Sequence, residues 1–122
     1  MIGYTTLGTA DFERARGFYD TVLAQLGGRL LYANEREAYW GHGPDAIKFA
    51  VVLPFDGKAP TVGNGSMVAL RAESRDQVDA THRTALGNGG LDVGPPGPRG
   101  EGTFYGGYFR DLDGHKICVF TT

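Results

Sequence analysis

Apolar and polar residues follow two different periods in the first half of the chain. Residues 2–8 alternate through a β-prone run, which predicts a strand. From Phe12 to Leu26 the apolar residues recur at helical spacing, with Asp11 before them as an N-cap and Gly27-Gly28 after them as a stop. Three further short strands complete a βαβββ module, over residues 29–33, 37–41 and 47–53.

The second half repeats this order with one weak strand. A strand over residues 66–72 precedes an N-cap at Ser74 and a helix that stops at residues 87–90. Residues 91–97 predict only a short strand because they contain Pro95-Pro96, and residues 97–102 predict a loop. A hairpin then follows, with strands over 104–110 and 115–120 and an Asp-Gly turn at 111–114.

The two halves also resemble each other residue by residue. Residues 4–11 align with residues 67–74 at an offset of 63 (67 − 4), and residues 48–52 align with 116–120 at an offset of 68 (116 − 48). Each helix is expected to cover one side of its own curled, mixed sheet, which leaves the other sides to line a cleft. We therefore expect one α+β domain over residues 1–122, with module 1 at about 1–53, a linker at 54–65 and module 2 at about 66–122.

Composition narrows the classes of function. The 122 residues carry a formal net charge of −2, which gives no reason to expect nucleic acid or a membrane surface as a partner. No apolar run approaches the roughly 20 residues of a membrane span. The one cysteine fits a reducing compartment. We expect a cytoplasmic protein whose partner is a small molecule.

Motifs in both halves resemble one known superfamily. Asp11-Phe12-Glu13-Arg14-Ala15, the following Phe18-Tyr19 and Leu26-Gly27, and the closing residues 109–117 are similar to those of the vicinal oxygen chelate superfamily. That group contains glyoxalase I, extradiol dioxygenases and bleomycin-resistance proteins. Leu112 stands where the family's closing motif has a proline. The resemblance implies a glyoxalase-like fold over the whole chain and a homodimer.

The same resemblance locates the positions where metal-dependent members hold their ion. Those members use histidine and glutamate on the first and last strands of each module. The corresponding residues here are Tyr4, Ala50, Met67 and Cys118. Because zinc, nickel and iron ions prefer imidazole and carboxylate ligands, we expect no metal and no other cofactor.

The alternation of side chains along the strands predicts a set of ligand-binding residues. Tyr4 can stack on a ligand or fill the volume of the missing metal site, and Tyr105 or Tyr108, but not both, can line the cleft because they fall on opposite faces. Arg99 suits an anionic group of a ligand. The expected ligand-binding residues are Tyr4, Thr6, Trp40, Ala50, Met67, Arg99, Tyr105 and Cys118.

The histidines offer little catalytic chemistry. His42, in a glycine-rich loop, is the candidate general acid or base, because it alone is expected near the cleft mouth. His82 is expected in a capping or surface role on its helix, and His115 in a solvated turn.

Two functions from different classes follow. The first is a glyoxalase- or bleomycin-resistance-like protein without the usual metal ligands, which binds a small aromatic or amphipathic molecule in an apolar cleft. The alternative is a glyoxalase-related lyase or isomerase acting on a small carbonyl or thiol-adduct substrate.

Overall fold

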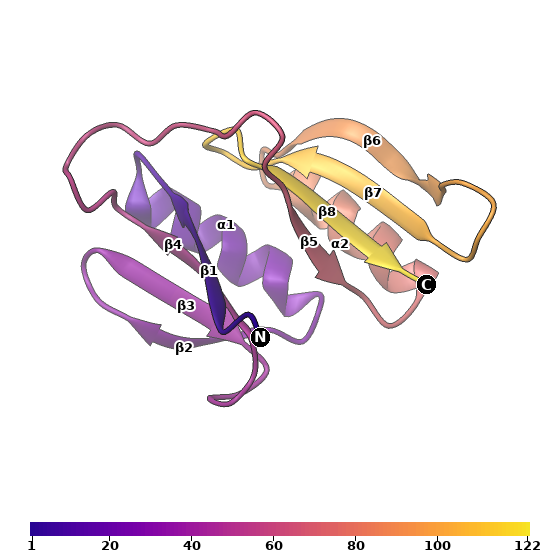
Figure 1. The fold of residues 1–122 in the computed structure, drawn as a ribbon, viewed down its shortest axis with the longest axis horizontal. Coiled ribbons are helices and arrows are strands. Elements are labelled where there is room, and N and C mark those ends of the chain that lie inside the picture. Colours follow the sequence, from indigo (N-terminus) through magenta and orange to yellow (C-terminus); the bar gives the residue numbers. More distant parts are fainter. The chain divides into compact units, whose positions relative to one another are not determined.

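The chain forms two compact units that share one architecture. The computed structural model describes residues 1–122 and divides them into residues 1–61 and residues 62–122 (Figure 1). Each unit contains one helix and one four-stranded mixed sheet, so the prediction of an α+β fold with two βαβββ modules is confirmed. Neither helix is long and apolar enough to cross a membrane.

In the first unit, strand order differs from sequence order. The sheet runs β1-β4-β3-β2, with β1 parallel to β4 and the other neighbours antiparallel. The bounds of β2 and β3 coincide with the predicted ranges. The elements are β1 (Tyr4–Gly8), α1 (Phe12–Ala24), β2 (Arg29–Ala33), β3 (Glu37–Gly41) and β4 (Lys48–Val52).

The second unit has the equivalent topology. Its sheet runs β5-β8-β7-β6, again with one parallel pair, β5 and β8. Residues 53–67, between the two sheets in sequence, form neither helix nor strand. The elements are β5 (Val68–Arg71), α2 (Arg75–Gly87), β6 (Leu91–Pro98), β7 (Tyr105–Arg110) and β8 (Lys116–Thr121).

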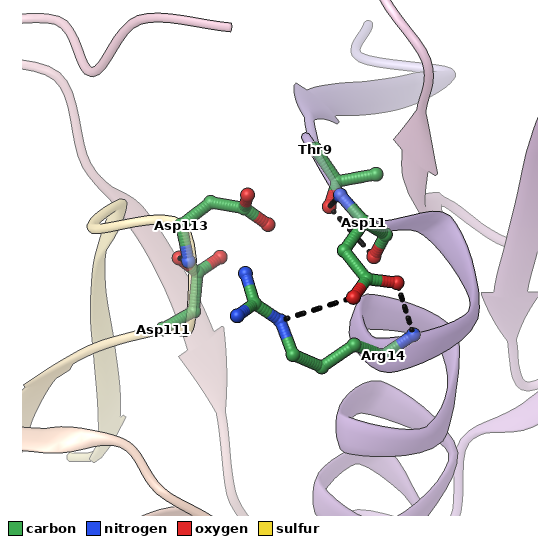
Figure 2. Close-up of polar contacts among 5 residues, drawn as sticks. All are labelled: Thr9, Asp11, Arg14, Asp111 and Asp113. Atoms are coloured by element: carbon green, nitrogen blue, oxygen red, sulfur yellow. Dashed lines mark hydrogen bonds and ion pairs between the residues drawn. The ribbon is translucent and has the colours of Figure 1, made fainter.

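Both helices begin at the predicted caps. Figure 2 shows the Asp11 carboxylate at the start of α1, where Oδ1 accepts a hydrogen bond from the Arg14 amide at 3.1 Å. The Thr9 hydroxyl donates to the Asp11 carbonyl oxygen at 3.0 Å and holds the residue before the helix in place. Ser74 Oγ accepts from the Gln77 amide at 3.1 Å at the start of α2. The bonds to the Asp11 and Ser74 side chains each satisfy an N–H group that a helix leaves unpaired in its first turn.

Each helix covers one side of the sheet of its own unit (Figure 1). In the first unit the Tyr19 ring lies 4.6 Å from the Phe49 ring, and Val22 is fully buried. In the second unit the His82 ring lies 6.3 Å from that of Phe109, and His82 is only 4 % exposed. The expected surface role of His82 is therefore wrong. His82 takes the position in α2 that Tyr19 takes in α1, and both point into the core.

Strand β6 is longer than its prolines suggested. It has eight residues, although Pro95 and Pro96 lie within it. Strand β6 is an edge strand of its sheet, and its pairing with β7 shifts register between Asp92 and Gly94 and again between Gly94 and Gly97. An edge strand tolerates residues that cannot donate a ladder hydrogen bond, and bulges absorb them.

The turn between β7 and β8 is built around a buried aspartate. Asp111 Oδ1 accepts from the amides of Asp113 at 3.0 Å and His115 at 2.9 Å, and Gly114 adopts a φ of 92°. The positive φ favours glycine at this position. His115 is 8 % exposed, so the expectation that it is solvated is wrong.

Candidate functional site

Each sheet has a second face that the helix of its unit does not cover. Here this is called the helix-free face. On β3 and β4, the residues Trp40 and Phe49 point toward α1, so their neighbours Tyr39 and Ala50 point the other way. The helix-free face of the first sheet carries Tyr4, Thr6, Tyr32, Tyr39, Lys48 and Ala50.

Three tyrosines form a row on this first face. The Tyr4 and Tyr39 rings meet edge to face with centroids 5.7 Å apart, and the Tyr32 and Tyr39 rings are 6.2 Å apart. Tyr4 is 60 % exposed and Tyr32 is 54 % exposed, whereas Ala50, the strand partner of Tyr39, is fully buried. Thr6 is the strand partner of Ala50 and is exposed. The sequence-predicted residues Tyr4, Thr6 and Ala50 therefore come together on one surface.

Tyr39 is a member of this surface that the sequence reasoning missed. Its position opposite Ala50 in the β3–β4 pairing could have revealed it. The Tyr39 hydroxyl donates to Glu37 Oε2 at 3.4 Å. Burial, followed by the charge of Glu37, raises the pKa of this phenol, so Tyr39 stays neutral at physiological pH.

Trp40 does not belong to the ligand-binding set. It is 1 % exposed, and its ring lies 6.1 Å from that of Tyr19 in the core under α1. Its indole Nε1 donates to Asp20 Oδ1 at 2.7 Å. Because neighbouring strand residues point to opposite faces, Tyr39 and Trp40 cannot both lie on the helix-free face. The expectation that Trp40 contacts a ligand is corrected on this ground.

The helix-free face of the second sheet is aromatic and basic. The residues of this face are assigned by the same alternation along the strands. Phe109 and Ile117 are fully buried on the side toward α2, so their neighbours point to the helix-free side. The Arg99 guanidinium lies 5.6 Å from the centroid of the Tyr108 ring. The face carries Ala69, Arg71, Gly106, Tyr108, Arg110, Lys116, Cys118 and Phe120.

Tyr105 lies on the opposite side of β7. Its hydroxyl donates to Asp79 Oδ1 on α2 at 2.6 Å, and the Arg75 guanidinium lies 4.8 Å from its ring centroid. The hydrogen bond to Asp79 is the main cause that raises the Tyr105 pKa. Of the two tyrosines that alternation separated, Tyr108 is on the helix-free face. Tyr105 is therefore corrected to a residue that joins the sheet to α2.

Cys118 is a buried thiol in the middle of the second face. It is 1 % exposed and pairs with Ala69 on one side and Tyr108 on the other. Burial raises the pKa of the thiol, although a hydrogen bond with Tyr108 and the charges of Arg99 and Lys116 oppose the shift. A protonated, buried thiol is a weak nucleophile and a weak metal ligand.

His42 is held by the backbone at the end of α1. Its Nε2 lies 2.8 Å from the carbonyl oxygen of Leu26, and Gly27 beside it has a φ of 74°. This contact occupies one ring nitrogen and pairs with a backbone carbonyl in the turn that follows α1. His42 is exposed and keeps its other ring nitrogen for chemistry, and no carboxylate orients it.

Met67, just before β5, is 46 % exposed and is the fourth of the positions that the family resemblance assigns to metal ligands. Together these positions present a phenol at Tyr4, a methyl group at Ala50, a thioether at Met67 and a protonated thiol at Cys118. Zinc, nickel and iron ions bind imidazole, carboxylate and thiolate groups. These four side chains do not fit such an ion.

Comparisons with known proteins agree with this architecture. A structure of a glyoxalase/bleomycin resistance protein from Albidiferax ferrireducens T118 superposes with a TM-score of 0.91 at 35 % identity, over 100 % of this chain and 98 % of that one. A glyoxalase-related enzyme from Fulvimarina pelagi has a TM-score of 0.80 at 21 % identity, over 100 % of this chain and 88 % of that one. A Vibrio cholerae protein named "Probable lactoylglutathione lyase" is 27 % identical over 120 residues, which cover 93 % of this chain and 85 % of the relative. The family model for the glyoxalase/bleomycin resistance protein/dioxygenase superfamily matches residues 1–119, and the chain belongs to that superfamily.

Proposed function

We propose that this protein binds a small aromatic or amphipathic molecule on its helix-free sheet faces without a divalent metal ion. The observation that carries the proposal is the row of Tyr4, Tyr39 and Tyr32 on the first sheet, whose outer two rings are more than half exposed. Large exposed aromatic surface on a rigid sheet is typical of ligand-binding sites.

The arrangement of the three rings suits a flat ligand. Edge-to-face contact with Tyr39 orients the Tyr4 ring, so little side-chain freedom is left to lose on binding. Each tyrosine also has a hydroxyl that can hydrogen-bond a polar group of the ligand. Such a surface favours a molecule with an aromatic body and a polar edge.

The metal-free part of the proposal rests on donor chemistry. Tyr4, Ala50, Met67 and Cys118 occupy the positions that the family resemblance assigns to metal ligands, and none of them is a histidine or a carboxylate. Chelation of two substrate oxygens by a metal would therefore require ligands from elsewhere in the chain. Recognition by aromatic contact requires none.

A titration with a neutral aromatic amide, 2-naphthamide, tests the proposal. Tyr4→Ala should weaken binding roughly fivefold, because one aromatic contact is lost. Phe55→Ala is the matched control, since Phe55 is fully exposed but lies outside both sheets. Equal affinities for the two variants, or no binding of 2-naphthamide by the wild type, would contradict the proposal.

A glyoxalase-related lyase or isomerase is the second candidate, favoured by the relative that is named a probable lactoylglutathione lyase. His42 or Tyr4 would then have to move the proton between carbons of a small carbonyl or thiol-adduct substrate. Isomerisation of the hemithioacetal of methylglyoxal and glutathione tests this candidate. Turnover that disappears in His42→Ala would support it, and absence of turnover in the wild type would exclude it for this substrate.

We also propose that the protein is a cytoplasmic homodimer. Relatives in the superfamily commonly oligomerise, and β1, β2, β5 and β6 are edge strands of their sheets. The single cysteine is free, which is consistent with a reducing compartment. Light scattering after size exclusion should give twice the 13.1 kDa mass of one chain. A mass of one chain at micromolar concentration would contradict the dimer.

A further inference from the structure

The helix-free face of the second sheet concentrates positive charge in a chain whose net charge is negative. None of the strand positions that alternation assigns to this face is acidic, and four cationic side chains lie on it or over it. Three come from the strands and one from the loop after β6. They are Arg71, Arg99, Arg110 and Lys116.

Three of these cations lie over aromatic rings, and the fourth, Arg110, donates to the Gly114 carbonyl oxygen at 3.1 Å. The Lys116 ammonium lies 5.3 Å and the Arg99 guanidinium 5.6 Å from the centroid of the same Tyr108 ring. The Arg71 guanidinium lies 4.9 Å from the centroid of the Phe120 ring, which stacks on Phe104. None of the four cations forms an ion pair within the chain. A ring attracts a cation without neutralising its charge.

The internal repeat supplies a direct comparison for Lys116. The matching residue of the first unit is Lys48, whose ammonium donates to the carbonyl oxygens of Pro44 and Ala46. Lys116 makes no such bond, and its ammonium lies over the Tyr108 ring. The two equivalent lysines therefore differ in their contacts: the Lys48 ammonium is hydrogen-bonded to a loop, whereas the Lys116 ammonium keeps its donors available.

Arg99 is fixed in position while part of its guanidinium remains unused. Its Nη2 donates to the Pro95 carbonyl at 2.6 Å and its Nη1 to the Pro98 carbonyl at 3.3 Å. A guanidinium has five N–H donors, so these two bonds leave others for an acceptor. Anchoring by the backbone lowers the conformational entropy that the side chain would lose when it binds an anion.

We propose that the helix-free face of the second sheet binds the carboxylate of a small aromatic acid between Arg99 and Lys116. This inference rests on the proposed function, because the aromatic ring of the same molecule would contact Tyr108 and Phe120 on this face. It adds a charge requirement: the ligand is an organic anion rather than a neutral or cationic aromatic molecule. Arg71 and Arg110 contribute to the field that attracts it.

Two probes with the same ring system, one anionic and one neutral, separate this inference from the proposed function. They are 2-naphthoate and 2-naphthamide, titrated against the full chain at low salt. The wild type should bind naphthoate roughly tenfold more tightly than naphthamide, and added salt should reduce the difference because exposed charges are screened. Inorganic phosphate should compete only weakly, since it lacks the aromatic ring.

Matched variants locate the anion site. Lys116→Gln should weaken naphthoate binding roughly tenfold and change naphthamide binding by less than about twofold. Lys58→Gln, the same change at an exposed lysine outside both sheets, should leave both affinities within about twofold. Arg99→Gln gives a second test at a residue outside the strands, and thermal unfolding of each variant checks that it is folded.

Every outcome decides between the two claims. Equal affinity of the wild type for both probes, or equal effects of Lys116→Gln and Lys58→Gln, overturns the anion site and leaves the proposed function standing. Binding of neither probe overturns both. If inorganic phosphate binds at this site as tightly as naphthoate does, the assignment to an aromatic acid is overturned.

Discussion

Tyr39 and Trp40 are consecutive aromatic residues of β3 with opposite environments. Trp40 is 1 % exposed, and its indole N–H donates a hydrogen bond to Asp20. Tyr39, in contrast, lies between the exposed rings of Tyr4 and Tyr32. A pleated strand sends neighbouring side chains to opposite faces, so one residue stabilises the core and the next contributes to the proposed binding face.

Cys118 gives a prediction at the same scale. Because burial raises the pKa of its thiol, the thiolate fraction at pH 8 is small and the sulfur is covered. The reaction with a disulfide reagent should be on the order of a hundredfold slower in the folded protein than in denaturant. The rate should increase as pH rises above the usual range for a thiol.

Tyr108→Phe tests the cause of the Cys118 reactivity in the same measurement. The hydrogen bond with Tyr108 lowers the Cys118 pKa, so its removal should raise that pKa further and slow the reaction while the ring stays in place. A folded-state rate equal to that in denaturant would show that Cys118 is accessible, against its burial in the structure.

At the scale of elements, the start of α1 depends on one side chain. The Asp11 carboxylate accepts from the Arg14 amide at 3.1 Å, and Arg14 Nε lies 3.9 Å from its other oxygen (Figure 2). Asp11→Ala should lower the free energy of unfolding by about 1 kcal/mol, because the cap acceptor is lost. Urea denaturation measures this change. Asp11→Asn keeps an acceptor and should retain most of the stability, so equal losses in both variants would contradict the capping role.

Most elements were predictable because their signals are local. Cap residues, helical spacing and the Asp-Gly turn each act within a few residues, and β2 and β3 have the bounds that the sequence predicts. Strand β6 was underestimated because tolerance of Pro95 and Pro96 depends on its place at the sheet edge. That place is a property of the whole sheet and not of the segment.

The candidate site was predictable only in part, for a related reason. Alternation within a strand correctly separated Tyr105 from Tyr108, but which of them faces α2 is decided by contacts with Asp79 and Arg75. The basic character of the second face was missed as well. It requires the register that pairs Arg110 with Lys116 and Arg71 with Phe120.

At the scale of the molecule, duplication produced two similar units whose surfaces differ. The first helix-free face has a row of tyrosines, and its Lys48 is engaged by the backbone. The second has a buried thiol that is hydrogen-bonded to Tyr108, and cations that lack ion pairs. One architecture thus supports an aromatic surface in one unit and an anion-attracting surface in the other.

The central claim, that ligand binding needs no divalent metal, is tested most directly by one titration. The affinity for 2-naphthoate is measured after exhaustive treatment with a chelator and again after addition of one equivalent of nickel or zinc. The donor set of Tyr4, Ala50, Met67 and Cys118 predicts dissociation constants that agree within about twofold. Loss of binding after chelation, with recovery on addition of one equivalent of metal, would contradict the claim.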